Sequence, residues 1–130
     1  MTKIPQGFTT VFPYLVVAGA HDYVEFLCKG LGGQLLGKHN RPDGMLANGQ
    51  VRFGDTTLMI GEAREDWTAN SGHYYFYVDD ADAAVKQAVD HGAELIMPVA
   101  DQPYGDRQGG VKDSRGNIWW ISQHLADGYF

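Results

Sequence analysis

The chain carries one stretch twice, as Tyr14-Leu15-Val16-Val17 ahead of Gly32-Gly33-Gln34-Leu35-Leu36 and as Tyr75-Phe76-Tyr77-Val78 ahead of Gly92-Ala93-Glu94-Leu95-Ile96. Val78 lies 61 positions after Val17, and Gly92 lies 60 positions after Gly32. Each copy consists of an apolar run, a helical pattern, a glycine and a second apolar run. The two offsets differ by one residue, and a pattern repeated at nearly the same offset predicts two similar structural units.

Each half is predicted to contain a strand, a helix and three further strands. The runs 11–17 and 74–78 are rich in β-branched and aromatic residues, which favours strands. The first helix is predicted to begin near Ala20, and the second has Asp79 or Asp80 as its N-cap. Strands follow at 34–36, 45–53 and 56–60, and again at 94–97, 111–113 and 118–122, with a glycine-rich loop between 97 and 111.

The predicted fold is therefore α+β, with two βαβββ modules in a single domain. The modules span about residues 8–61 and 72–124, and a polar segment without periodicity, 62–71, is the predicted linker. Glycine-containing turns at 54–55 and 115–117 are typical of hairpins. A lone module leaves one sheet face uncovered, so the two modules are expected to pair around a small-molecule pocket.

Composition limits the class of partner. With a net charge of −6 and a pI near 5.1, the chain lacks the basic face that nucleic acid requires, whereas a cationic ligand would suit it. The single Cys28 cannot form an internal disulfide. The N-terminus lacks the succession of charged, apolar and small residues that is typical of a signal peptide. No apolar run approaches the roughly 20 residues that cross a bilayer. We therefore expect a cytoplasmic protein that binds neither nucleic acid nor membranes.

Six motifs carry a resemblance to a known family. They are Pro13-Tyr14-Leu15-Val16-Val17, Pro42-Asp43-Gly44, Phe53-Gly54-Asp55, Tyr77-Val78-Asp79-Asp80, Asp101-Gln102-Pro103-Tyr104-Gly105-Asp106-Arg107 and Asp113-Ser114-Arg115-Gly116-Asn117. On these motifs the chain resembles the vicinal oxygen chelate superfamily of glyoxalases, bleomycin-resistance proteins and extradiol dioxygenases, especially its short glyoxalase-like branch. The resemblance implies curled mixed sheets that form a ligand cavity, in a homodimer.

The resemblance also implies four positions for the ligands of a divalent metal, where family enzymes carry His, Glu or Gln. In this sequence the four positions hold Phe12, Met59, His73 and Trp120. Only His73 matches, and the His-Ala-Glu triplet of the branch is replaced by Asn48-Gly49-Gln50, which supplies no catalytic base. We therefore expect no metal cofactor, while a divalent metal held by His73 and other ligands stays open.

Two functions remain as hypotheses. The first is a metal-free protein of the bleomycin-resistance type, which binds a small aromatic or cationic molecule in an aromatic-lined pocket. The alternative is a divalent-metal-dependent lyase, isomerase or dioxygenase that uses His73. The sequence does not decide whether the protein is an enzyme, and it does not identify the ligand.

The predicted ligand-binding residues are Phe12, His73, Tyr104, Arg107 and Trp120. Strand alternation sends neighbouring side chains to opposite faces, so only one of the two adjacent tryptophans can face a cavity, and the resemblance assigns this to Trp120 beside Phe12. Arg107 and Tyr104 would reach over the pocket, where a guanidinium offers a planar fork to an anionic or carbonyl group. In the alternative interpretation these residues form a turn in which Arg107 pairs with Asp106.

Tyr75 and His124 are not among the predicted ligand-binding residues. Tyr75 is predicted to belong to the core, as most aromatic side chains do. His124 follows the last predicted strand, where it either caps the rim of the pocket or is a solvated terminal histidine.

Overall fold

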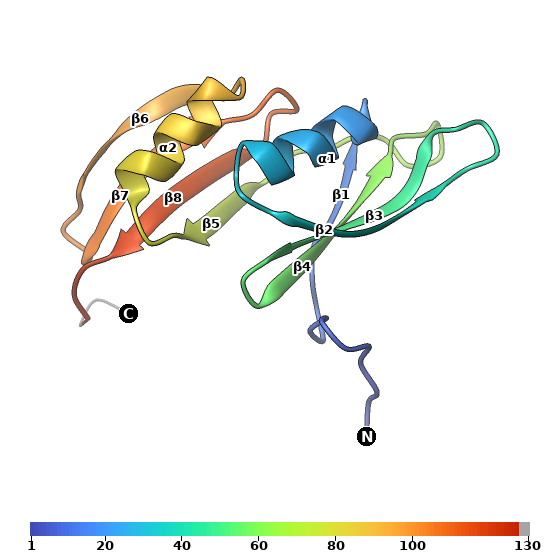
Figure 1. Cartoon of the computed structure of the whole chain (residues 1–130), viewed down its shortest axis with the longest axis horizontal. Coiled ribbons are helices and arrows are strands. Elements are labelled where there is room, and N and C mark those ends of the chain that lie inside the picture. The colour runs from blue at the N-terminus through green and yellow to red at the C-terminus, as the bar shows by residue number, and fades with distance from the viewer. Residues whose placement is uncertain (128–130) are drawn as a thin grey trace. The chain divides into compact units, whose positions relative to one another are not determined.

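The computed structural model describes residues 1–127, and the chain divides between Asn70 and Ser71 into two compact units. The first unit contains β1 (Tyr14–Val17), α1 (Ala20–Lys29), β2 (Gln34–Asn40), β3 (Leu46–Phe53) and β4 (Thr56–Glu62) (Figure 1). The second contains β5 (His73–Tyr77), α2 (Ala81–Asp90), β6 (Glu94–Asp101), β7 (Asp106–Lys112) and β8 (Ile118–His124). The predicted α+β fold of two βαβββ modules is confirmed.

Each unit is built on a four-stranded mixed sheet with the same connectivity. The strand order is β1-β4-β3-β2 in the first unit and β5-β8-β7-β6 in the second. In both units the first strand pairs in parallel with the last one, and the remaining pairs are antiparallel. A parallel pair needs a long crossover connection, and in each unit the helix and the two intervening strands supply it.

The helix of each unit covers one face of its sheet, and the core of each unit lies between its own helix and sheet. In the first unit Tyr23 and Leu27 of α1 and Ile60 of β4 are fully buried. In the second unit Ala88 of α2 and Ile121 of β8 are fully buried. Burial of each large aliphatic side chain contributes about 1.5–3 kcal/mol, so this layer holds each unit together. Neither of these ten-residue helices is long or apolar enough to cross a membrane, and the described residues contain no other helix.

The two helices begin in the same way. The Glu62 carboxylate, at the end of β4, accepts hydrogen bonds from the backbone N–H groups of Gly19 and Ala20, at 2.9 Å each. Gln123 of β8, 61 positions later, accepts one from the N–H of Ala81 at 3.1 Å. Asp80 caps α2 through the N–H of Ala83, as predicted. Each last strand therefore supplies a side chain that satisfies N–H groups at the start of its helix.

The prediction of a loop between 97 and 111 was wrong, because this segment contains the second half of β6 and most of β7, joined by a short turn. Its glycines make room for neighbouring side chains. A Cβ atom on Gly109 would lie 2.7 Å from Val99, and one on Gly110 would lie 2.6 Å from the ring of Trp120. Glycine inside a strand often marks such a close approach, and it does not have to end the strand.

A buried carboxylate organises the hairpin between β7 and β8. Asp113 is 4% exposed, and its Oδ1 accepts hydrogen bonds from the backbone N–H groups of Arg115 and Asn117 at 2.9 and 3.1 Å. Its Oδ2 accepts one from the indole N–H of Trp119 at 2.9 Å. The Asn117 side chain in turn accepts a hydrogen bond from the N–H of Gly72, just before β5.

Replacing Asp113 by alanine should lower the free energy of unfolding by about 2–4 kcal/mol, because three donors in the hairpin lose their acceptor. Urea denaturation followed by far-UV circular dichroism measures this change. Asp55, in the corresponding hairpin of the first unit, is exposed and serves as the matched control. Asp55→Ala should change the free energy by about 0.5 kcal/mol or less. Equal effects of the two substitutions would contradict the role given to Asp113.

Candidate ligand-binding site

The face of the second sheet that α2 does not cover carries polar and aromatic side chains in place of a core. Besides Lys112 at the end of β7, the strand register puts eight of them on this face, which we call the helix-free face of the second unit. They are His73, Tyr75, Tyr77, Asp106, Gln108, Trp120, Ser122 and His124. Trp119 faces the other way and is 3% exposed, so the prediction that the two tryptophans lie on opposite faces is confirmed.

His73 and Trp120 contact each other at one end of this face. The indole N–H of Trp120 donates a hydrogen bond to Nδ1 of His73 at 3.1 Å, and the two rings stack with their centroids 6.0 Å apart. An indole N–H can only donate, so Nδ1 of His73 is the acceptor and carries no proton. The proton of the His73 ring is therefore on Nε2 in this geometry.

A buried carboxylate, Asp106, occupies the other end of the same face. Its side chain is fully buried, and Oδ2 accepts hydrogen bonds from the hydroxyl groups of Tyr75 and Tyr77, the second at 3.0 Å. Oδ1 accepts one from Nδ1 of His124 at 2.9 Å. The other nitrogen of His124, Nε2, lies 2.6 Å from Oδ1 of Asp127, whose side chain is almost fully exposed.

These contacts fix the charges of the cluster. Burial alone raises the pKa of Asp106, but the hydrogen bonds from Tyr75, His124 and Tyr77 outweigh it and hold this pKa below its usual range. The hydrogen bonds to Asp106 and Asp127 raise the pKa of His124. Burial, together with the nearby Asp106, raises the pKa of Tyr75 and of Tyr77. At neutral pH the cluster thus holds an ionised Asp106 and neutral tyrosines.

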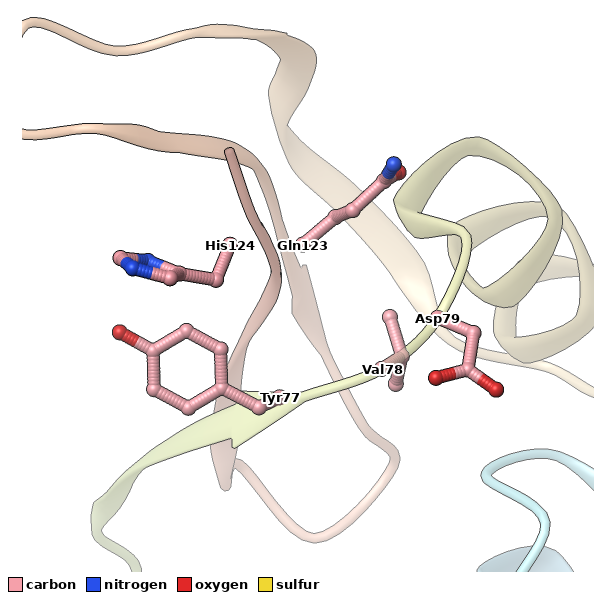
Figure 2. A pocket seen from close by; sticks show the side chains of 5 residues that line it. All are labelled: Tyr77, Val78, Asp79, Gln123 and His124. Carbon is pink, nitrogen blue, oxygen red and sulfur yellow. The ribbon is translucent and has the colours of Figure 1, made fainter. Parts of the chain in front are cut away.

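A hollow of about 380 Å³ opens beside this cluster, where β5 and β8 end. It is lined by Tyr77, Val78, Asp79, Gln123 and His124. Figure 2 shows Tyr77 and His124 projecting together to one side, whereas Gln123 and Asp79 are directed to the other. The rings of Tyr77 and His124 meet edge to face with centroids 6.0 Å apart. The imidazole that Asp106 holds is therefore exposed to a space that a small ring could enter.

Tyr104 and Arg107 lie at the edges of this arrangement. Tyr104, in the turn between β6 and β7, donates a hydrogen bond from its hydroxyl to Oε1 of the buried Gln108. The guanidinium of Arg107 lies on the α2 side, where it binds both carboxylate oxygens of Asp82 at 2.7 and 3.1 Å and also Asp101 at 2.9 Å. The alternative pairing of Arg107 with Asp106 was wrong, because adjacent residues of a strand face opposite sides of the sheet.

Phe12 belongs to the first unit. It precedes β1, is half-buried and packs against Phe8 with ring centroids 5.0 Å apart. The helix-free face of that unit carries amides in place of the His-Ala-Glu triplet. Asn48 donates hydrogen bonds to the hydroxyl of Tyr14 at 3.5 Å and to the sulfur of Met59 at 3.3 Å, and it accepts one from Gln50.

The sequence profile of the Glyoxalase/Bleomycin resistance protein/Dioxygenase superfamily matches residues 9–121. The chain belongs to this superfamily. It is 28% identical over 126 aligned positions to an uncharacterized protein of Mycobacterium bovis. The alignment covers 88% of this chain and 83% of that protein. An uncharacterized protein of Mycobacterium tuberculosis is equally similar, with 88% and 74% covered.

Solved structures share the fold over nearly their whole length. TioX from Micromonospora sp. ML1 has a TM-score of 0.72 and 23% identity, over 88% of this chain and 99% of that one. TnmS3 from Streptomyces sp. CB03234, described as an antibiotic binding protein, has a TM-score of 0.68 and 20% identity, over 89% and 97%. At these identities the similarity shows the fold alone.

The residues at the superfamily's metal positions do not fit a metal ion. A phenyl ring and an indole, as in Phe12 and Trp120, have no lone pair to donate, and the sulfur of Met59 already accepts a hydrogen bond from Asn48. His73 alone offers a suitable ligand type. Within residues 1–127, no three His, Cys, Asp or Glu side chains are grouped so that they could hold a metal.

The helix-free face also contains one residue that the sequence placed wrongly and others to which the sequence assigned no role. Tyr75 was predicted as core but is 47% exposed, so that prediction was wrong, and Tyr77 is 46% exposed. Asp106 and His124 were not predicted as a pair. The one available signal was spacing, because an antiparallel register across the β7–β8 hairpin places Asp106 opposite His124. The sequence could not predict that register, because the predicted loop covered the residues where β7 begins.

The stability of the protein should depend on the protonation of His124. A folded-state pKa above the ordinary value of about 6.5 means that its contribution is complete below this value and is lost as the pH rises through the folded pKa. The free energy of unfolding of the wild type, minus that of His124→Gln, should therefore be constant at mildly acidic pH and decrease towards alkaline pH. Urea denaturation across this range measures the difference. A difference that increases with pH would contradict the assigned charges.

Proposed function

We propose that the protein binds a small aromatic molecule on the helix-free face of its second unit, without a metal ion. The observation that carries this proposal is the hydrogen-bonded and stacked pair of His73 and Trp120 on the same exposed face as Tyr75 and Tyr77. Aromatic side chains with polar tips provide apolar area for a flat ligand and fix its orientation through hydrogen bonds.

The polarity of the His73–Trp120 hydrogen bond supports binding without a metal. A histidine that coordinates a metal through one nitrogen usually donates a hydrogen bond from the other. His73 does the reverse, because its Nδ1 accepts from the indole of Trp120 and its proton is therefore on Nε2. A metal ion could bind Nε2 only if His73 lost that proton or gave up the hydrogen bond from the indole of Trp120. The pair is thus better suited to a ligand that accepts a hydrogen bond from His73.

The similarity to TnmS3 agrees with this proposal, since that protein is described as antibiotic binding and has the same fold without close sequence identity. Tyr104 borders the proposed face through Gln108, whereas Arg107 faces α2, so we expect no direct ligand contact from Arg107. The role of Phe12, the pairing of modules around a cavity and the homodimer stay predictions from the family resemblance.

The test is a thermal-shift screen of flat aromatic compounds, followed by titration of any hit against variants. Trp120→Leu and His73→Ala should each weaken binding at least about tenfold, because each removes part of the pair, equivalent to about 1.4 kcal/mol or more. Trp67→Leu, which removes an exposed tryptophan of the first unit, is the matched control and should bind as the wild type does. A ligand at 100 times its dissociation constant stabilises the protein by about 2.7 kcal/mol, which the screen detects.

Metal analysis of protein purified without an affinity tag tests the metal-free part of the proposal. Stoichiometric zinc, nickel, iron or manganese that is lost in His73→Ala would overturn it in favour of the metal-dependent lyase, isomerase or dioxygenase. Binding that is unaffected by both Trp120→Leu and His73→Ala would instead place the site elsewhere. Unfolding measurements on each variant identify losses that come from a damaged fold.

A further inference from the structure

We propose that His124 anchors the acidic hydroxyl of an aromatic ligand, which takes the place that the carboxylate of Asp127 holds in this structure. The inference rests on the proposed function and deepens it, because it names a class of ligand, weakly acidic phenols, and the group that recognises them. It places the acidic end of the ligand at the hollow where β5 and β8 end.

The first step of the argument is that Asp106 fixes the orientation of His124. Asp106 is fully buried, and its Oδ1 binds Nδ1 of the imidazole while the hydroxyls of Tyr75 and Tyr77 occupy Oδ2. Since an ionised carboxylate only accepts, Nδ1 of His124 carries a proton. The remaining nitrogen, Nε2, is left to interact with groups outside the cluster. A buried carboxylate behind a histidine is a common way to hold the ring for proton exchange.

The second step is that Nε2 already binds an acidic group. Oδ1 of Asp127 lies 2.6 Å from it, and the Asp127 side chain is almost fully exposed. An exposed ion pair of this kind contributes only about 0–1 kcal/mol, so a ligand oxygen can displace it. Asp127 therefore marks the position of an anionic oxygen on His124, much as a ligand would.

The third step is the shape and chemistry of the surroundings. The ring of Tyr77 meets that of His124 edge to face beside the hollow, which gives an aromatic ligand a surface to pack against. Within the described residues, the lining of the hollow includes no lysine or arginine that would pair with a carboxylate ligand. Asp79 also lines the hollow and disfavours a molecule that arrives as an anion. A neutral phenol avoids this repulsion when it enters.

The proton balance is simple. When His124 is neutral, the O–H bond of the phenol breaks, its proton moves to Nε2, and the phenolate oxygen stays paired with the imidazolium. The same complex forms from a phenolate and an already protonated His124, with Asp127 released to solvent. On dissociation the proton returns to the oxygen. The groups that face this exchange are Tyr75 and Tyr77 from β5, Asp106 from β7, Asp127 after β8 and Asp79 at the hollow.

The experiment compares para-nitrophenol with para-nitroanisole, which has the same ring but no ionisable hydroxyl. Only the phenolate form of nitrophenol absorbs in the visible, so absorbance as a function of pH gives the apparent pKa of the bound molecule. We expect bound nitrophenol to ionise at a pH about one unit lower than in water, which corresponds to about tenfold stabilisation of the phenolate. Nitroanisole should bind at least about tenfold more weakly than nitrophenol.

Three variants assign the effect to His124. His124→Gln should abolish the shift in the ionisation of nitrophenol and remove the preference for nitrophenol over nitroanisole. Asp127→Asn should tighten nitrophenol binding a few-fold, because it weakens the competing internal contact, whereas a purely structural role for Asp127 would not tighten it. His39→Gln, which changes an exposed histidine of the first unit, is the control and should have no effect.

The outcomes separate this inference from the proposed function. If both compounds bind equally, or if His124→Gln keeps the ionisation shift, the assignment to His124 is overturned while binding of aromatic molecules stands. If neither compound binds, the assignment is also overturned, and the proposed function is then judged by the wider screen and the Trp120→Leu variant. If the His124→Gln protein does not fold, Asp106→Asn is tested in its place. This variant keeps an acceptor for the two tyrosine hydroxyls and should also reduce the shift in the ionisation of nitrophenol.

Discussion

Parallel pairing of the first strand of each unit with its last strand is the constraint on which the rest of the structure depends. Because β5 and β8 run in parallel, the chain must cross back between them, and α2 packs on one face of the sheet in doing so. The last strand then supplies Gln123 to the first N–H group of that helix. The same logic joins β4 to α1 through Glu62, so each unit fastens its helix to the strand that completes its sheet.

This arrangement also determines where chemistry can be located. One helix covers one face, so the other face of the second sheet has no covering layer within its unit, and its residues are not selected by a core. Two tyrosines that are nearly half exposed lie there with a fully buried carboxylate. Burying a charge is costly unless hydrogen bonds compensate it, and Asp106 has three of them. A fully apolar packing would have avoided that cost.

The sequence predicted the architecture because the repeat, the turn residues and the helix stripes all report on local structure. It placed His73 and Trp120 together only through the family resemblance, and the structure adds the direction of their hydrogen bond. The Asp106 cluster could not be predicted, since it depends on pairing across three strands, which requires the correct start of β7. Gly109 and Gly110 hid that start, because glycines that admit Val99 and Trp120 look like a loop in the sequence.

The two ends of the helix-free face use histidine in opposite ways. Nδ1 of His73 accepts a hydrogen bond from an indole, whereas Nδ1 of His124 donates one to a buried carboxylate, which raises the pKa of His124. A ligand that spans both ends would therefore meet a donor, Nε2–H of His73, and the proposed proton-exchanging group, His124. On the proposed function, this difference would orient a flat molecule along the face. The two ends of the face thus differ in the hydrogen bonds that their histidines make, although both rings come from strands of the same sheet.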